Sequence, residues 1–321
     1  MLMNSTKTMF LMIMIISTTM MLSSSNILFS WMSMEINLIV FLPLISKSKK
    51  MKDQIMKYFI IQSLSSSILL LSIILKFKVE PPMNFELMTM TSLMMKTGMI
   101  PFHFWLPTMM EKLSWENCMI MNTWQKISPT IMFCQMIKFN MLIIPMIISL
   151  MMGTISMMKN SSMKKILAFS SIYNSPWMIL SMLISKSMFL LFFTSYSMIN
   201  IMLMNKLKKN NMIYMNQMNK KNSIMKFSIM INLISMSGMP PMLGFFPKWM
   251  ILTKINEMSI MMSIFMILSS MISTFIYLKM ISPMFLLQMT KKKMNKSKKS
   301  NQMELTINFL GTMMFMILKP N

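Results

Sequence analysis

Four charged residues stand inside long apolar stretches of this sequence, where a charge is costly to place. Glu35 lies in WMSMEINLIVFLPLI, Lys96 in LMMKTGMIPFHFWLP, Lys126 in NTWQKISP and Lys248 in GMPPMLGFFPKWMIL. On insertion scales a lysine at the centre of a membrane helix costs about 2.5 to 3.5 kcal/mol. Charged groups at such positions usually face a bundle interior or a wet cavity and mark ion pathways. We therefore treat these four residues as the candidate functional residues.

A lysine beside a carboxylate can act as a proton switch. Burial favours the neutral amine, whereas a nearby carboxylate favours the ammonium. If Glu35 approaches Lys96 and then withdraws, the amine gains and releases a proton. Arginine could not do this because its guanidinium stays protonated, and the chain contains no arginine. A structural ion pair that only locks two helices together is the alternative interpretation of these residues.

Glycine and proline interrupt the apolar stretches close to the lysines. Pro101 removes a backbone hydrogen bond and clashes with the carbonyl four residues earlier, while Gly98 loosens the same turn. Pro129 follows Lys126 by one turn, which predicts a milder distortion. Five interrupting residues precede Lys248: Gly238, Pro240, Pro241, Gly244 and Pro247. Broken helices at membrane depth survive only within protein or beside water, and paired ones indicate an ion site.

The composition identifies the chain as a polytopic membrane protein. Its 321 residues are 55% hydrophobic, with a mean hydropathy of +0.56. A net charge of +24 is typical of nucleic-acid-binding proteins, but here the lysines lie in short loops between apolar runs and not on one soluble face. We therefore expect no nucleic acid and interpret the lysines as topology signals.

Spans of about 20 residues divide the chain into eleven candidate transmembrane helices. We expect an all-α membrane protein whose residues 1–321 form a single polytopic domain with no soluble domain. The expected spans are 8–28, 29–46, 55–75, 87–107, 115–138, 140–158, 164–184, 186–205, 225–252, 258–285 and 303–318.

The lysines are distributed unequally between alternate loops, and the positive side predicts the orientation. Twenty lie on the side of the N-terminus: Lys7, Lys47, Lys49, Lys50, Lys52, Lys112, Lys159, Lys164, Lys165, Lys206, Lys208, Lys209, Lys220, Lys221, Lys291, Lys292, Lys293, Lys296, Lys298 and Lys299. Six lie on the other: Lys76, Lys78, Lys138, Lys186, Lys254 and Lys319. The 58 methionines and absent arginine are typical of animal mitochondrial coding, and no import presequence is visible. We expect a mitochondrial inner-membrane protein with its N-terminus in the matrix.

No cofactor or metal site is expected in this chain. Cys118 and Cys134 lie in apolar runs without CxxC or Cys/His spacing, so we interpret them as inert thiols. The sequence has neither GxGxxG nor a phosphate-binding loop. His103, the one histidine, stands beside the expected break at Lys96. It could relay a proton, or it could be a packed interfacial ring beside Trp105.

Five motifs, in their order and spacing, resemble the antiporter-like subunits of respiratory complex I. MEINLIVFLPLI, MKTGMIPFHFWLP, TWQKISP, KKILAFSSI and GMPPMLGFFPKW are similar to the subunit 2 family of mitochondrial NADH:ubiquinone oxidoreductase, of arthropod type. The resemblance covers most of the chain. It implies two inverted repeats with two discontinuous helices, in the eleven-helix animal form, within the proton-pumping membrane arm.

The resemblance also implies roles for the four charged residues. Glu35 and Lys96 correspond to the family's carboxylate and lysine pair, Lys126 to its central lysine, and Lys248 to the lysine of the second broken helix. Protons would move from the matrix to the intermembrane space, driven by electron transfer elsewhere in the complex. Other subunits would use NADH, FMN, iron–sulfur clusters and ubiquinone. The implied partners are other membrane-arm subunits and the lipid bilayer, including cardiolipin.

Two departures and two alternative functions accompany the resemblance. Asn174 and Pro176 stand where histidine and glycine are expected, which puts a titrating role on that helix in doubt, and Thr108 replaces an acid found in related chains. A stand-alone cation/proton antiporter would suit the lysines and broken helices equally, although a single buried glutamate argues against a sodium site. A non-conducting scaffold subunit, whose buried charges only fix helix register, is the other alternative.

Overall fold

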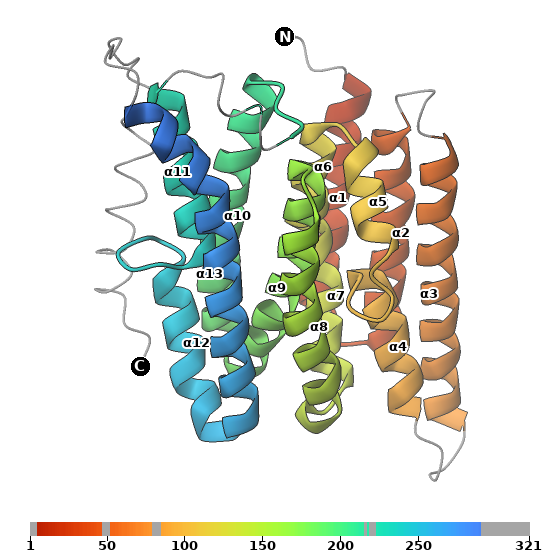
Figure 1. Cartoon of the computed structure of the whole chain (residues 1–321). Helices are drawn as coiled ribbons and strands as arrows, with labels where there is room; N and C mark the ends of the chain where they lie inside the picture. Colours follow the sequence, from red (N-terminus) through yellow and green to blue (C-terminus); the bar gives the residue numbers. More distant parts are fainter. Residues whose placement is uncertain (1–4, 47–51, 79–84, 215–216, 218–222, 290–321) are drawn as a thin grey trace. The chain divides into compact units, whose positions relative to one another are not determined.

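The computed structural model describes residues 5–46, 52–78, 85–214, 217 and 223–289, and these residues are almost entirely helical (Figure 1). They form thirteen helices, with one isolated bridge between Ser162 and Tyr214. The helices are α1 (Ser5–Ser23), α2 (Ile27–Ile45), α3 (Lys52–Lys78), α4 (Phe85–Thr97), α5 (Trp105–Lys112), α6 (Trp115–Asn122), α7 (Trp124–Met136), α8 (Phe139–Lys159), α9 (Met163–Ile184), α10 (Lys186–Lys209), α11 (Ser223–Ser237), α12 (Phe245–Met258) and α13 (Ile260–Met289).

The all-α membrane prediction is confirmed, and three expected spans are pairs of shorter helices. Seven described helices are long and apolar enough to cross a membrane: α1, α2, α3, α8, α9, α10 and α13. The expected span 87–107 is divided into α4 and α5, 115–138 into α6 and α7, and 225–252 into α11 and α12. The expected span 303–318 lies outside the described residues.

The chain divides into two compact units, residues 1–149 and 150–321. In the first unit α1 packs on α2, α2 and α4 pack on α3, and α7 packs on α4. In the second unit α9 contacts α10 and α12, while α11 contacts α10 and α13. Each unit contains one helix that is broken by a longer connection, α4–α5 in the first and α11–α12 in the second. A single domain over the whole chain stays a prediction.

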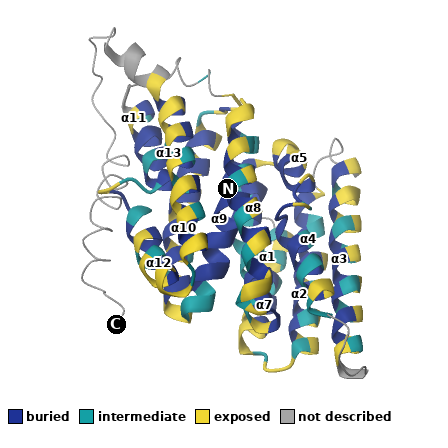
Figure 2. Ribbon diagram, turned by 60° about the horizontal axis from the view of Figure 1, so that its bottom comes forward, coloured by how far each residue is buried: buried dark blue, intermediate teal, exposed yellow. Residues whose placement is uncertain are grey.

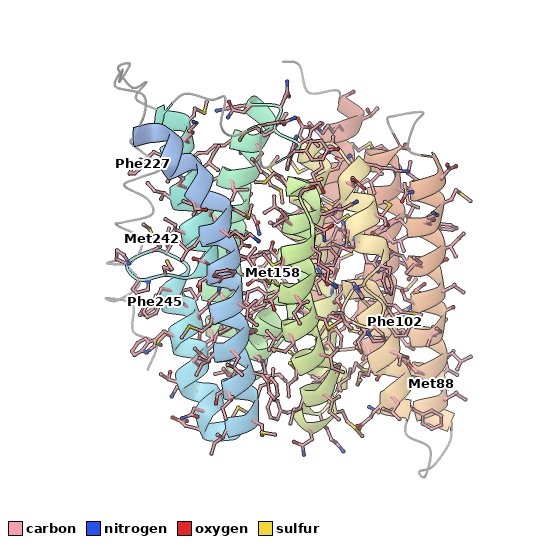
Figure 3. All side chains as sticks on the ribbon, viewed as in Figure 1. Met88, Phe102, Met158, Phe227, Met242 and Phe245 are labelled. Carbon is pink, nitrogen blue, oxygen red and sulfur yellow. The ribbon has the colours of Figure 1, made fainter. Side chains whose placement is uncertain are left out.

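Exposed apolar side chains cover the outer faces of the helices in both units (Figure 2). Met88 on α4 and Phe227 on α11 project from their helices in this way (Figure 3), with 44% and 48% of their surface exposed. By contrast, 89% of the apolar stretch of α9 that is long enough to cross a membrane is buried. An apolar exterior of this extent is the surface that lipid tails cover. Lys96, Lys126 and Lys248, by contrast, are buried inside the units.

Candidate functional site

Both broken helices end in the same glycine-terminated turn. At the end of α4 the N–H of Gly98 donates to the Met95 carbonyl and that of Met99 to the Met94 carbonyl, which is a Schellman motif. At the end of α11, Gly238 fills the corresponding position. The φ angles of Gly98 and Gly238 are +70° and +82°, a region in which a side chain is strained. Glycine therefore fixes where each helix stops.

A lysine ammonium binds the carbonyl groups that each stop leaves without a helical partner. The Nζ of Lys126 donates to the Thr97 carbonyl at the end of α4, at 2.6 Å. The Nζ of Lys248 donates to the carbonyls of Ser237 and Met236 at the end of α11, at 3.0 and 3.3 Å. The carboxyl end of a helix carries a partial negative charge of roughly half a unit, so a cation there is stabilised. The same device thus occurs once in each unit.

Lys96 occupies the last turn of α4 and meets Glu35 of α2. Its Nζ lies 3.4 Å from Oε1 of Glu35. The Lys96 side chain is 4% exposed and that of Glu35 is 24% exposed, so the carboxylate has more room to move. The Lys96 carbonyl accepts from the amide of Gln62 at 3.3 Å. The structure therefore brings Glu35, Lys96 and, through the neighbouring Thr97, Lys126 together in the first unit.

A cavity of about 30 Å³ joins Lys96 to Lys126. A water needs roughly 10 to 15 Å³ of such space, so the cavity can hold about two waters. Besides the two lysines, its lining includes the polar side chains of Asn37, Tyr58, Gln62, Thr97, Gln125 and Ser128. Water in this cavity would have enough polar partners to be held in place.

Sequence reasoning missed the amide pair that lines this cavity. Asn37 and Gln125 donate to each other's carbonyl oxygens, both at 3.2 Å, and Asn37 also approaches the hydroxyl of Ser128 at 3.4 Å. The pair connects α2 to α7. The signal was present in the sequence, because Asn37 stands two residues after Glu35 and Gln125 immediately before Lys126, each an amide within an apolar run.

The helix break near Lys126 precedes the lysine. The helix is interrupted at Thr123, between α6 and α7, where the backbone has φ −111° and ψ −77°. The Thr123 hydroxyl donates to the Met119 carbonyl at 2.7 Å, and such back-bonding bends helices. Pro129 lies inside α7, which continues across it. The break in this segment therefore lies before Lys126, and a milder distortion at Pro129 stays a prediction.

Lys248 lies in the second unit, between the end of α11 and two aromatic rings of α9. Its Nζ is 5.3 Å from the centre of the Tyr173 ring and 5.7 Å from that of Trp177, within the range of cation–π attraction. It is 7% exposed and borders a cavity of about 20 Å³. Asn174, at the position where the resemblance implied a histidine, lines the same cavity and donates to the Ser170 carbonyl at 2.8 Å. Its amide cannot titrate.

His103 lies in the connection between α4 and α5, beside Phe102, which Figure 3 labels. The residue is 9% exposed, its ring is tilted by 32° against the ring of Phe104 at a centroid distance of 4.2 Å, and its Nδ1 lies 3.3 Å from the Pro101 carbonyl. It does not line the cavity between Lys96 and Lys126. A relay role for His103 stays a prediction.

Lys206 was counted above among the loop lysines, and this interpretation is wrong. It lies within α10, is 5% exposed, and donates from Nζ to the Ser228 carbonyl of α11 at 3.0 Å. The KLKK sequence at the end of α10 resembles a loop signal, but only Lys208 and Lys209 of this group are exposed. Among the residues described, no cluster of three or more His, Cys, Asp or Glu side chains could hold a metal ion.

Comparison with known proteins places this architecture in a family. Residues 24–276 match the family described as NADH:quinone oxidoreductase/Mrp antiporter, TM. NADH-ubiquinone oxidoreductase chain 2 of Anopheles gambiae is 34% identical to this chain over 94% of both chains. The protein of the same name from Locusta migratoria is 35% identical, over 86% of this chain and 84% of its own.

Solved structures share the fold at much lower identity. A chain of respiratory complex I from Thermus thermophilus superimposes with a TM-score of 0.77 at 14% identity, covering 96% of this chain and 76% of that chain. The sequence relatives carry the assignment, since they match along nearly the whole length at more than 30% identity. The chain belongs to the NADH-ubiquinone oxidoreductase chain 2 family, within the antiporter-like membrane proteins.

Proposed function

We propose that this chain is a proton-translocating membrane-arm subunit of NADH:ubiquinone oxidoreductase. Protons move from the matrix to the intermembrane space of the mitochondrial inner membrane, and the N-terminus lies in the matrix. The redox cofactors, NADH, FMN, iron–sulfur clusters and ubiquinone, are bound by other subunits. The partners are the other membrane-arm subunits and the surrounding lipid, cardiolipin included. We also propose that residues 1–321 form a single polytopic membrane domain.

The observation that supports the proposal most is that Lys96 and Lys126 line one cavity, while Glu35 pairs with Lys96. Three helices, α2, α4 and α7, supply these groups. Lys96 has a movable carboxylate as its counter-charge at 3.4 Å, whereas Lys126 has the fixed Thr97 carbonyl at 2.6 Å. Two adjacent amines with different counter-charges can exchange a proton when one counter-charge moves.

In the proposed transfer, Glu35 rotates away from Lys96. The ammonium then loses its stabilising charge, and its proton passes to a water in the 30 Å³ cavity. That water gives a proton to Lys126 once Lys126 has passed its own proton onward. Return of Glu35 restores the charged form of Lys96, which takes a new proton. Lys248 serves as the corresponding carrier in the second unit.

Two substitutions of Lys96 test the proposal. Lys96→Met keeps the apolar stem, removes the titrating amine, and relieves an insertion penalty of roughly 2.5 to 3.5 kcal/mol. We expect this complex to assemble with reduced quinone reductase turnover and reduced proton pumping. Lys96→Arg should be impaired in the same way, because a guanidinium stays protonated. Lys112→Met is the matched control, since Lys112 is exposed on α5 of the same broken helix.

The alternatives give different results in the same assay. A scaffold subunit would tolerate Lys96→Met with full turnover and an undiminished ratio of protons to electrons, and this outcome would refute the proposal. A stand-alone cation/proton antiporter would exchange sodium for protons in vesicles without NADH or quinone. Sodium-dependent exchange that is independent of the redox reaction would therefore favour the antiporter.

A further inference from the structure

Lys206 is a buried amine that takes no part in the proton transfer proposed above. It lies in the last turn of α10, whereas Lys208 and Lys209 of the same turn are exposed. Its ammonium is held by the Ser228 carbonyl of α11 at 3.0 Å. Since this arrangement resembles those of Lys126 and Lys248, with Nζ on a backbone carbonyl of another helix, the question is whether Lys206 communicates with either of them.

Helices α10 and α11, both labelled in Figure 1, pack together within the second unit, and a buried polar seam runs along their contact. The seam is defined by three side chains of α10 and three of α11, all of them 5% exposed or less: Tyr196, Asn200 and Lys206, and Ser228, Asn232 and Ser235. At 100° per residue, each set of three falls within a sector of about 120° of its helix. The side chains of each set therefore point to the same side of their helix.

The seam connects Lys206 to Lys248. At one end the two helices are joined by the bond from Lys206 to the Ser228 carbonyl. At the other end, Tyr196 and Ser235 line the 20 Å³ cavity that Lys248 borders. Asn200 and Asn232 lie between these ends along their helices. The ten residues from Tyr196 to Lys206 span about 15 Å along α10.

Polar atoms in the middle of the seam are incompletely bonded by protein. The Tyr196 hydroxyl interacts with the Asn200 side chain one turn along α10. Within the described part of the chain, neither amide atom of Asn200 nor the hydroxyl of Tyr196 makes a hydrogen bond of ordinary geometry, although all three atoms are buried. Buried polar groups are bonded to protein or to ordered water in nearly all structures. The cavity beside Lys248 is large enough for one water. Water is therefore the natural partner along the seam.

We propose that Lys206 is a further proton carrier, connected to Lys248 by a hydrated seam of Tyr196, Asn200 and Asn232. This inference rests on the proposed function and names a path within it. The Lys206 ammonium gives its proton to an adjacent water, and successive waters pass protons along the seam. Lys248, once it has passed its own proton onward, accepts the last one. One positive charge thus moves from Lys206 to Lys248. Lys206 is recharged by a new proton that is taken up at the end of α10.

The test compares Lys206→Met, Lys206→Arg and Lys209→Met in the whole complex, purified and reconstituted in liposomes. Lys209 is exposed one turn after Lys206, so it controls for loss of a positive charge at this end of α10. We expect Lys206→Met to lower proton pumping about tenfold. This loss is smaller than the loss that removal of a general acid–base group typically causes. Lys209→Met should retain it. Full pumping by Lys206→Met would overturn the proposal.

Lys206→Arg separates a carrier from a structural cation. An arginine can keep the positive charge and the bond to the Ser228 carbonyl but does not release its proton. We expect it to be as impaired as Lys206→Met, and recovery of pumping by Lys206→Arg would overturn the proposal. If Lys206→Met does not assemble, Asn200→Leu decides: reduced pumping at normal assembly supports the seam, and full pumping overturns it.

The Lys96 variants distinguish failure of this inference from failure of the proposed function. Reduced pumping by Lys96→Met together with full pumping by Lys206→Met overturns only the path through Lys206. Full pumping by both overturns the proposed function as well. A structure of the complex that resolves waters gives an independent measurement. Waters at hydrogen-bonding distance along the seam support the path, whereas a dry apolar gap overturns it.

Discussion

Replacing Gly238 by alanine should displace Lys248 from its carbonyl partners. A Cβ at Gly238 would lie 2.9 Å from Cδ and 3.2 Å from Nζ of Lys248, whereas non-bonded carbon atoms prefer about 3.5 to 4.0 Å. The lysine must therefore move by about 0.6 Å or more at Cδ. Its bond to the Ser237 carbonyl, now 3.0 Å, would then exceed ordinary hydrogen-bond length. A hydrogen bond to a charged group contributes about 1.5 to 3 kcal/mol.

Gly98→Ala is the matched control for this substitution. Its φ of +70° resembles the +82° of Gly238, so both alanines carry a similar backbone penalty of roughly 1 to 2 kcal/mol. The Cβ at Gly98 would meet apolar side chains, Leu106 at 3.0 Å and Trp105 at 3.3 Å, and not a lysine. The two variants therefore share the strain of a positive φ and differ in what the new methyl group meets, which at Gly238 is the Gly244 carbonyl oxygen at 3.2 Å as well as Lys248.

The assay measures assembled complex, quinone reductase turnover and proton pumping for both alanine variants. We expect similar losses of assembled complex, with an additional loss of pumping per assembled complex for Gly238→Ala. If pumping per assembled complex is equal in the two variants, the position of Lys248 against the helix end does not matter. The reasoning about helix-end carbonyls would then be refuted.

Two further substitutions test the surroundings of the first unit. Gln125→Leu removes both bonds of the amide pair with Asn37 and should destabilise the unit by about 1 to 3 kcal/mol, because a buried amide is left unsatisfied. Thermal unfolding of the purified complex measures this loss, and an unchanged unfolding temperature would contradict it. Lys138→Met removes an ion pair with Glu86 at 3.6 Å in which the lysine side chain is 81% exposed. It should change stability by less than about 1 kcal/mol and leave turnover unchanged, so a strong loss would show that this pair has another role.

The positions of the helix breaks could be predicted because they depend on local backbone chemistry. Gly98 and Gly238 each stand at a place where the chain needs a positive φ, and a nearby proline prevents the helix from continuing. The interruption at Thr123 was not predicted, since the hydroxyl bond to the Met119 carbonyl that accompanies it is one that threonines in continuous helices also make. Local sequence alone does not separate the two outcomes.

The partners of the lysines depend on packing between helices distant in sequence. That Lys126 would meet the Thr97 carbonyl, 29 residues away, follows from the packing of α7 on α4 and from no feature of either segment alone. Lys206 shows the same limit. Its place beside two exposed lysines predicts a loop, and only the contact between α10 and α11 makes it a buried amine.

The helix ends also explain how this chain accommodates several buried amines with one glutamate inside a span. Lys126 and Lys248 donate to carbonyls at the ends of α4 and α11, where the helix dipole stabilises a cation. These carbonyls are fixed, because a glycine-terminated turn sets where each helix stops. The counter-charge of Lys96 is instead on the partly exposed side chain of Glu35, which can rotate. We infer that the fixed sites hold protons and that the movable carboxylate decides when Lys96 releases one.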